Sequence, residues 1–425
     1  MKSKFIAMAV AAVATASAAN AADLGHPVAA AVDYVKVCDA YGAGFFYIPG
    51  GDTCLKIGGR VYLDERVGGG TLSRESATNS VFADKTRAGN TYFTRSAIYV
   101  NFDARTNTDF GLLRSYIDLR IRNSTGSLNE TDMDFGYVQW GGLTAGKARS
   151  FFDFAPSGGY SYGPDYVFYQ TNTLLNELGY TFSFGNGVTA TIGIQDSTSA
   201  DSTYNNLLRN EKTDAYGGNH TPDVVANLNI TQAWGSAQIG AALHEDYSAT
   251  VGSKEGWAIN AGTEILLPML AKGDKIALMA GYAEGALGFL TAGAQGSGNI
   301  GTAFHPGNYI GDDWTVVGGS LKQTANWGAD VSFKHVFNPN FEFNIDATYL
   351  GVEGSGARDF SLYGIDGNIV WFPTGKSNFS IGTDLSYGAI NYTGATRAAN
   401  TALNGGNGLA NVSGWEAMIR VNRTF

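Results

Sequence analysis

Charged side chains recur at every second position in several stretches of this sequence. Between residues 113 and 122, one row of alternating residues is charged or polar and consists of Arg114, Tyr116, Asp118, Arg120 and Arg122. The row between them is mostly apolar and consists of Leu113, Ser115, Ile117, Leu119 and Ile121. Charged rows of this kind act through their electric field, because opposed charges across a narrow aqueous gap orient water and set ion preference.

The candidate site residues form one basic row and two acids. The basic row, in which Asp118 also lies, consists of Arg60, Arg95, Arg114, Arg120, Arg122, Lys147 and Arg149. The acids are Asp153 and Asp165, in the segment 151–166, which is rich in aromatic residues and glycine. This segment is too apolar for a freely solvated loop, so we predict that it folds inward and sets the acids opposite the basic row. The alternative is that these charged side chains pair with one another along one wall.

Alternation with a period of two predicts β-strands, since successive strand side chains point to opposite faces and a helix would spread the charge around its axis. Sixteen strands are predicted, with the approximate ranges 54–66, 91–105, 111–122, 133–141, 143–149, 173–184, 188–196, 223–231, 236–245, 256–266, 274–284, 324–335, 341–350, 360–372, 378–388 and 413–425. The pattern is weakest at 143–149 and in the region 313–335, and a further strand could lie within 313–323. Short turns rich in Gly, Asn and Pro alternate with long loops near 67–90, 150–171, 197–222, 287–312 and 389–411.

The composition fits a large sheet with two contrasting faces. Charged residues make up 16% of the 425 residues, against about 25% in an average soluble domain. An even number of strands, with short turns at one end and long loops at the other, is typical of a bacterial outer-membrane barrel, whose sheet closes so that every backbone polar group is paired. We therefore predict an all-β fold over 54–425, a 16-stranded antiparallel transmembrane β-barrel with an inward-folded constriction loop after the fifth strand.

A secreted soluble sandwich or β-helix would also show alternation, and the last residue distinguishes these classes. Phe425 closes an amphipathic strand, and a C-terminal aromatic residue is what the barrel-assembly machinery of the outer membrane recognises. This favours the barrel and a location in the bacterial outer membrane, with outer-membrane lipid and lipopolysaccharide around it.

The N-terminal residues indicate export. Residues 1–21 carry two lysines, an apolar stretch rich in alanine, and the small-x-small sequence Ala19-Asn20-Ala21, which together predict a cleaved signal peptide. Residues 22–53 are predicted to form a periplasmic N-terminal segment. In an oxidising compartment the closely spaced Cys38 and Cys54 favour a disulfide, while a zinc site is the alternative and would need two further ligands.

A sixteen-stranded barrel leaves an aqueous channel, so we expect passive passage of small hydrophilic solutes and ions. A substrate-selective channel, for example for a sugar, is an alternative, because the aromatic residues of 151–169 could form a slide along the pore. An enzyme is disfavoured, since none of the five histidines lies in a recognisable nucleophile motif. A formal net charge of −10 disfavours nucleic-acid binding, and no cofactor or metal is expected. The net charge points to cation preference and the basic row to anion preference.

One stretch of sequence resembles a known family. Residues 34–50 (YVKVCDAYGAGFFYIPG), followed by 54–59 (CLKIGG), are similar to the N-terminal signature of the alphaproteobacterial outer-membrane porins found in Brucella and rhizobia. Shorter similarities occur in order at 178–182, 222–225, 234–236 and 423–425. The resemblance implies a homotrimer of sixteen-stranded barrels, an inward-folded third loop and general passage of small hydrophilic molecules. It also implies that Cys38 and Cys54 are a paired structural feature.

Overall fold

The computed structural model describes residues 36–70, 92–125, 127–154, 173–196, 220–291, 313–354, 359–375, 378–394 and 411–425. These ranges are almost entirely β-strand, with two short helical turns, η1 (Asp39–Tyr41) and α2 (Gly288–Thr291). None of the described helices is both long and apolar enough to span a membrane. The predicted signal peptide, residues 1–21, lies outside the described residues.

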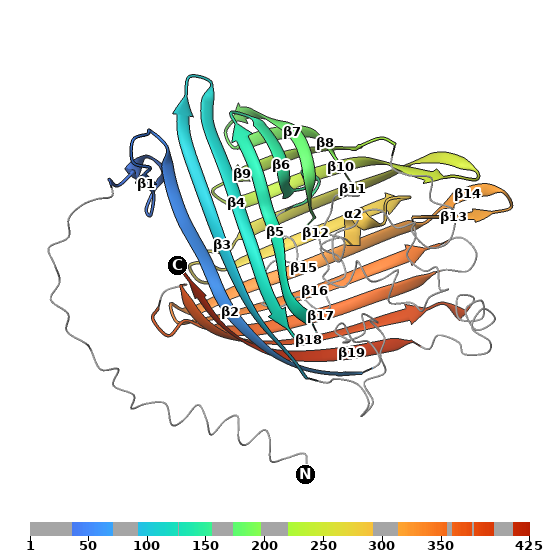
Figure 1. The fold of residues 1–425 in the computed structure, drawn as a ribbon. Coiled ribbons are helices and arrows are strands. Elements are labelled where there is room, and N and C mark those ends of the chain that lie inside the picture. The colour runs from blue at the N-terminus through green and yellow to red at the C-terminus, as the bar shows by residue number, and fades with distance from the viewer. Residues whose placement is uncertain are drawn as a thin grey trace, which may run out of the picture.

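Sixteen described strands form one closed sheet (Figure 1). They are β2 (Cys54–Gly70), β3 (Tyr92–Thr108), β4 (Gly111–Ser124), β5 (Ser127–Trp140), β6 (Leu143–Arg149), β7 (Leu174–Gly185), β8 (Val188–Gln195), β9 (Asp223–Gln232), β10 (Gly235–Ser248), β11 (Gly252–Leu266), β12 (Lys275–Glu284), β15 (Ala325–Asn338), β16 (Phe341–Glu353), β17 (Phe360–Trp371), β18 (Phe379–Tyr392) and β19 (Val412–Thr424). Each corresponds to one predicted strand.

The barrel closes because its last strand pairs with its first. Arg420 of β19 lies opposite Asp64 of β2, and β12 pairs directly with β15. All neighbouring pairs around the ring are antiparallel. The predicted 16-stranded antiparallel barrel is therefore confirmed.

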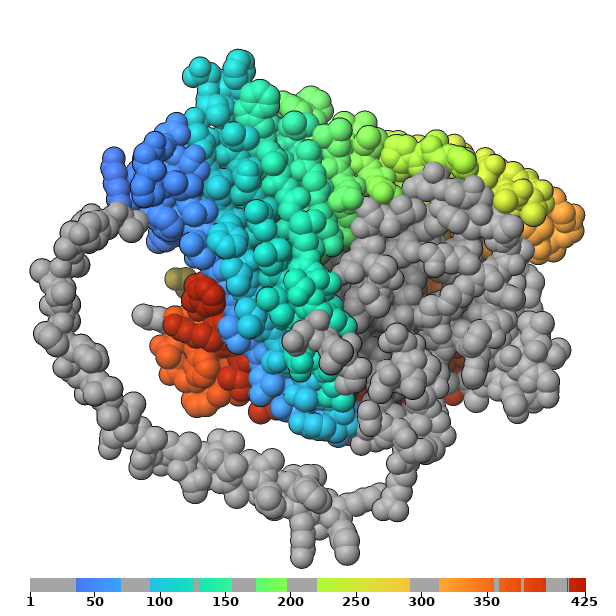
Figure 2. Space-filling model, in the orientation of Figure 1, coloured from blue at the N-terminus to red at the C-terminus, as the bar shows by residue number. Residues whose placement is uncertain are grey.

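The two faces of the sheet differ in polarity, as the alternation predicts. On β2 the outward residues Ile57 and Leu63 are 48% and 42% exposed, whereas the inward residues Asp64 and Arg66 are 0% and 3% exposed. Side chains of β2 to β5, coloured blue to blue-green, form much of the outer wall on the face shown in Figure 2. A wall that is apolar outside and charged inside suits lipid on one side and water on the other.

Aromatic side chains form two bands on the outer face. Near the short-turn end, the exposed aromatic residues are Phe110, Trp140, Tyr180, Phe182, Phe184, Trp234, Phe337, Phe341, Trp371 and Phe425. Near the opposite end they are Tyr92, Trp257, Tyr282, Trp327, Tyr349, Tyr363, Tyr387 and Trp415. Rings on neighbouring strands contact one another within each band, for example Trp327 and Tyr349, whose centroids are 5.0 Å apart. Such bands mark the two interfaces of a bilayer with water.

The N-terminal segment lies at the short-turn end, near the last residues of the chain (Figure 1). Its two-residue strand β1 (Phe46–Tyr47) pairs with the start of β2. Cys38 and Cys54 form a disulfide, with their Cα atoms 6.0 Å apart. The predicted disulfide is thus confirmed, and it joins the segment to the barrel wall.

Three features differ in detail from the predicted pattern. Strand β5 begins at Ser127 rather than near residue 133, and a bulge at Asp134 shifts its alternation. The connections 125–126 and 249–251 are short although they lie at the long-loop end. The region 313–323, where a further strand was considered, holds two short strands, β13 (Trp314–Val317) and β14 (Ser320–Gln323), which form a separate hairpin outside the barrel sheet.

Candidate functional site: the constriction inside the barrel

The loop after β6, which is the fifth strand of the barrel, turns inward in its described part, residues 150–154. Phe152 and Phe154 are 0% and 2% exposed, although they follow a strand end that faces solution. Three backbone carbonyls of this stretch accept hydrogen bonds from amide side chains of β9, β10 and β11. The donor–acceptor pairs are Asn227 to Phe151 (2.6 Å), Asn260 to Phe152 (3.0 Å) and Gln238 to Asp153 (2.9 Å).

Inward-facing glycines make room for this stretch against the wall. A Cβ atom on Gly179 or Gly193 would lie 2.3 Å or 2.8 Å from the ring of Phe151. A Cβ atom on Gly262 would lie 2.4 Å from the ring of Phe154. Contacts of that length would be steric overlaps. The absence of side chains at these glycines therefore leaves the groove in which the loop lies.

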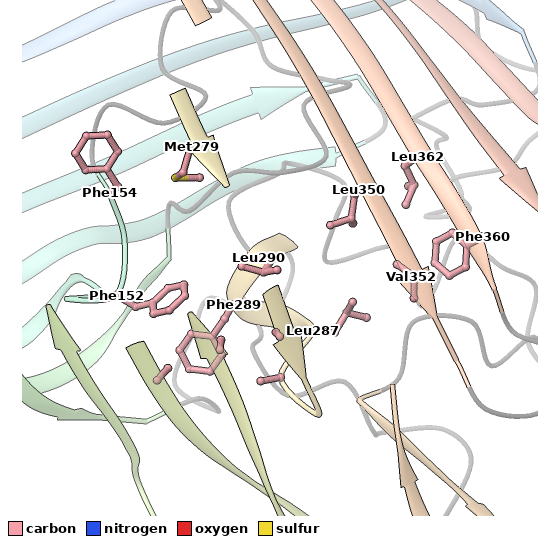
Figure 3. Close-up of a cluster of buried hydrophobic side chains, with 14 of the residues drawn as sticks. Phe152, Phe154, Met279, Leu287, Phe289, Leu290, Leu350, Val352, Phe360 and Leu362 are labelled. Atoms are coloured by element: carbon pink, nitrogen blue, oxygen red, sulfur yellow. The ribbon is translucent and has the colours of Figure 1, made fainter. Parts of the chain in front are cut away.

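A second segment also reaches the lumen, and it was not predicted. Helix α2, in the loop after β12, buries Phe289 and Leu290, and the preceding Leu287 is also buried. The rings of Phe289 and Phe152 meet edge to face, with centroids 5.1 Å apart, and lie side by side in Figure 3. Apolar inward residues of β16 and β17 line the same interior region; they are Leu350, Val352, Phe360 and Leu362 (Figure 3). Two inward segments therefore narrow the barrel together.

Arg114 is held within the wall by an acid on the neighbouring strand. Its guanidinium makes two bonds to Asp103, of 2.9 Å and 3.0 Å, and a third, of 3.1 Å, to Gln139. It also lies over the rings of Tyr116 and Tyr137, 5.0 Å and 5.6 Å from their centroids. A bidentate, stacked arginine has a fixed orientation, so its charge stays at one place on the lumen wall.

Arg120 and Arg122 bind three acids of β5. Arg120 contacts Asp132 and Asp134, both at 2.9 Å, and Arg122 contacts Asp132 at 2.8 Å and Glu130 at 2.9 Å. Asp132 and Asp134 lie two residues apart and share the inward face, as alternation expects. The bulge at Asp134 then shifts the alternation, so that Gln139 also faces the lumen. These arginines therefore pair along the wall, which is the alternative that the sequence left open.

The remaining members of the basic row also lie on the wall. Arg60 is exposed and its guanidinium carbon is 3.9 Å from the ring centroid of Tyr99. The guanidinium of Arg95 lies over Phe93, and the ammonium of Lys147 donates a 2.7 Å hydrogen bond to a backbone carbonyl of β5. Asp118 is half-buried on β4, and its Oδ1 has no hydrogen-bond partner in the described part of the chain.

Asp153 lies in the inward loop, near Arg149, the member of the basic row at the end of β6. Its carboxylate accepts a hydrogen bond from the backbone N–H of Thr173, and the nearby charge of Arg149 acts on it. Burial raises the pKa of Asp153 to about 7, because the effects of Arg149 and of this hydrogen bond only partly offset the loss of solvent. The other predicted acid, Asp165, lies outside the described residues.

A charged network at the closing seam was not predicted. Asp64 binds Arg420 at 2.7 Å and Arg66 at 3.1 Å, and Arg66 in turn binds Glu416 at 3.2 Å. All four side chains lie on the inward rows of β2 and β19. The seam therefore joins the first and last strands through ion pairs as well as through the backbone ladder.

Acids dominate the wall on the other side of the barrel. Strand β15 is eight strands away from β5 around the ring of sixteen, and is therefore opposite it. Inward acids of β15 to β18 are Asp330, Asp346, Asp366 and Asp384. Within the described residues, neither Asp346 nor Asp366 forms an ion pair, whereas the arginines of β4 do. The acids of β15–β18 thus lie on the side of the ring opposite β4 and β5, where the arginines are paired.

Phe425 completes the pairing of β19 with β2. Its backbone N–H donates a 3.0 Å hydrogen bond to the carbonyl of Gly59, and the N–H of Gly59 donates one of 3.2 Å to the carbonyl of Phe425. The ring is 61% exposed on the outer face. Its role in recognition by the assembly machinery stays a prediction.

Comparison with known proteins places this architecture in a family. The family model described as "Porin subfamily" matches residues 26–409. The protein named Porin Omp2b of Brucella suis is 33% identical over 255 residues, which are 56% of this chain and 64% of that protein. Porin Omp2b of Brucella abortus is 35% identical over 250 residues, with the same coverage. The chain thus matches just under two thirds of the length of these relatives.

Solved structures show the same fold at low sequence identity. The outer-membrane channel DcaP of Acinetobacter baumannii has a TM-score of 0.64 and 13% identity, and the match covers 89% of this chain and 99% of that protein. The anion-selective porin of Comamonas acidovorans has a TM-score of 0.51 and 11% identity, covering 88% of this chain and 100% of that protein. Because the family model extends from the N-terminal signature almost to β19, the chain belongs to the porin subfamily of the bacterial outer membrane.

Proposed function

We propose that this porin forms a water-filled channel through which small hydrophilic solutes and ions diffuse passively across the outer membrane. The observation that carries the proposal is a closed sixteen-stranded barrel whose inward rows are charged and whose outward rows are apolar. A barrel of this size encloses more space than its own side chains fill. The loop after β6 and helix α2 set the size of the passage.

The charged walls tune which ions pass. Fixed arginines on β4 and acids on β15 to β18 face one another across the lumen and create a transverse field. Neutralising Arg114 and Arg120 together as glutamines removes two positive charges and leaves the acids of β3 and β5 uncompensated. The reversal potential in a KCl gradient should then shift toward cation selectivity. Unchanged selectivity and conductance in correctly folded protein would contradict this role of the wall.

Permeation is tested by swelling of liposomes that contain the purified protein. Sugars of increasing mass should enter at rates that fall with size, and entry should not saturate with concentration. A substrate-selective channel would instead show saturation and block of the ion current by one sugar. Phe152 and Phe154 cannot form an aromatic slide, because they are buried, and the other aromatic residues of that proposal, apart from half-buried Phe151, lie outside the described residues.

The partners follow from the same architecture. The two aromatic bands support contact with outer-membrane lipid and lipopolysaccharide, and the paired, exposed Phe425 supports recognition by the barrel-assembly machinery. A solved structure of OmpT from Vibrio cholerae, with a TM-score of 0.51, is described as a trimer form, which supports a homotrimer here. Cross-linking of the protein in outer-membrane vesicles should give a band at three times the chain mass.

The proposed division of the chain is a signal peptide at 1–21, a periplasmic segment at 22–53 and the barrel at 54–425. The position of residues 36–53 at the short-turn end supports a periplasmic location for that segment, because short turns of such barrels face the periplasm. Membership of a channel family indicates a channel rather than an enzyme. Assays of lipid and peptide hydrolysis with purified protein test that distinction.

A further inference from the structure

Four titratable side chains cluster on the lumen wall beside helix α2. His244 and Asp246 lie on the inward row of β10, and Asp313 lies directly before β13. One ligand atom from each of these three residues lies within 4.8 Å of the others. Their side chains are almost completely buried, with 4%, 1% and 0% of each residue exposed. The fourth member is Asp223, at the start of β9.

Asp223 orients the imidazole of His244. The Nδ1 atom of His244 is 2.7 Å from Oδ1 of Asp223. A carboxylate in this position fixes the ring and leaves Nε2 as the second nitrogen, which is the arrangement found behind histidine ligands of metal ions. The edge of Phe289 from α2 also lies against the ring, with centroids 6.2 Å apart, and restricts its rotation.

Hydrogen bonds to neighbouring segments anchor the two other carboxylates, and Asp246 keeps one unpartnered oxygen in the described part of the chain. Oδ2 of Asp246 accepts from Gln323 at 2.7 Å, while Oδ1 has no hydrogen-bond partner in the described part of the chain. Oδ1 of Asp313 accepts from the backbone N–H of Leu287 at 2.6 Å. A fully buried carboxylate oxygen without a partner is costly, and a cation would remove that cost.

We propose that His244, Asp246 and Asp313 bind one divalent transition-metal ion, with zinc as the representative, and that Asp223 is a positioning residue for His244. One imidazole nitrogen and two carboxylate oxygens suit zinc, whereas magnesium and calcium prefer oxygen ligands alone. Zinc bonds of about 2.0–2.2 Å place tetrahedral ligand atoms about 3.4 Å apart, so the three groups need to draw together by at most a little over 1 Å. The fourth position is left for water.

The bound ion would connect the barrel wall with the inward segment. Two ligands belong to β10, and the third, Asp313, accepts a hydrogen bond from the backbone N–H of Leu287, the residue directly before α2. The carbonyl of Asp313 also accepts a 2.7 Å hydrogen bond from Thr324, at the start of β15. Metal binding would therefore fix α2, and with it the edge-to-face contact with Phe152, in the narrowed position.

The test is a titration of zinc into full-length protein without a polyhistidine tag, in detergent, after treatment with a chelator. A competing chromophoric indicator should report one zinc ion per chain, with a dissociation constant of about 1 µM or below. Asp246→Asn and Asp313→Asn should each abolish stoichiometric binding, and Asp223→Asn should weaken it about 10- to 100-fold. Magnesium and calcium at equal concentration should not displace the ion.

His335→Gln is the matched control. His335 also pairs with an aspartate, at 2.6 Å from Asp274, but at the short-turn end of the barrel, so this variant should bind zinc as the wild type does. Where a variant does not fold, X-ray absorption of zinc-loaded wild-type protein gives the ligand set directly. Three results would each overturn the proposal. They are the absence of stoichiometric zinc binding by the wild type, binding as tight as that of the wild type in Asp246→Asn or Asp313→Asn, and an absorption spectrum without an imidazole ligand to zinc. These measurements do not depend on permeation, so they stand or fall separately from the channel function.

Discussion

The three amide side chains that hold the inward loop provide a direct perturbation of the constriction. Asn227, Gln238 and Asn260 donate hydrogen bonds of 2.6 Å, 2.9 Å and 3.0 Å to consecutive backbone carbonyls of residues 151–153. Each such bond contributes about 1 kcal/mol net, and more where the carbonyl is left buried and unpaired. Replacing all three residues by alanine should therefore cost the docked loop about 3 kcal/mol.

A loss of this size should strongly shift the equilibrium between docked and undocked loop, and it should hardly affect the stability of the barrel. Since about 1.4 kcal/mol corresponds to a factor of ten, the equilibrium between docked and undocked loop should shift by on the order of 100-fold. Single-channel recordings of the triple variant should show frequent transitions to a larger conductance level. The barrel itself should remain folded, because the ladders between its strands are untouched.

The matched control is Asn368→Ala. Asn368 is also a buried, inward-facing amide, and it accepts a 2.7 Å hydrogen bond from Asn344 on the neighbouring strand. It makes no hydrogen bond to residues 150–154, the described part of the loop. This variant should conduct as the wild type does. Heat-modifiable migration on gels shows whether the triple variant is folded. If the folded triple variant has the same conductance and noise as the wild type, then these amides do not hold the constriction and the reasoning is refuted.

Three further predictions follow from the same contacts. Gly262→Val should displace Phe154, since a Cβ atom at position 262 would lie 2.4 Å from the ring, and should destabilise the docked loop by about 1–3 kcal/mol. Raised noise in the single-channel conductance checks this. The control is Gly367→Ala, where the atom nearest to the added Cβ is 3.9 Å away. Because burial raises the pKa of Asp153 to about 7, the docked loop should be most stable at low pH and should lose stability as the pH rises from about 4, the ordinary pKa of an aspartate, to about 7. Current noise recorded from pH 4 to 8 should rise across that window, and Asp153→Asn should flatten the pH profile. An unaltered profile in this variant would assign the pH dependence to another group, such as the neighbouring Glu177. Reducing the Cys38–Cys54 bond should release the N-terminal segment, since closing a loop of this size contributes about 3 kcal/mol to stability in the chain-entropy account. Limited proteolysis of the reduced protein should then cut before residue 54 while the barrel stays intact. Equal protection from protease with and without reductant would contradict this.

The strands could be predicted because their environment imposes a strict period. A wall between lipid and water forces apolar and polar residues to alternate, and each of the sixteen strands carries that signal. The prediction was weakest where the constraint ends. The start of β5 was predicted six residues too late, because the bulge at Asp134 shifts the alternation within the strand and hides its first half.

The charged wall was largely predictable, but its pairing was not. Alternation places Arg114, Arg120 and Arg122 on the inward face, and that is where they lie. Which acid each one binds depends on strand register and on the bulge, and neither can be read from the spacing within one strand. The same limit applies to Asp64 and Arg420, which are adjacent only because the ring closes between the first and last strands.

The inner surface that receives the loop has no periodic signal. Gly179, Gly193 and Gly262 act through the absence of a side chain, so they resemble any other glycine of a glycine-rich chain. Helix α2 left a detectable trace, an apolar run at 286–290 within a long loop, but nothing in the run itself indicates contact with Phe152. The cluster of His244, Asp246 and Asp313 likewise combines residues from segments far apart in the sequence.

Planar-bilayer recording of the purified protein tests the central account most directly. A water-filled barrel narrowed by two inward segments predicts discrete conductance steps that increase in proportion to the conductivity of the KCl solution on both sides. Protein that inserts into the bilayer, as shown by protection of the barrel from protease, and yet gives no conductance steps would contradict it.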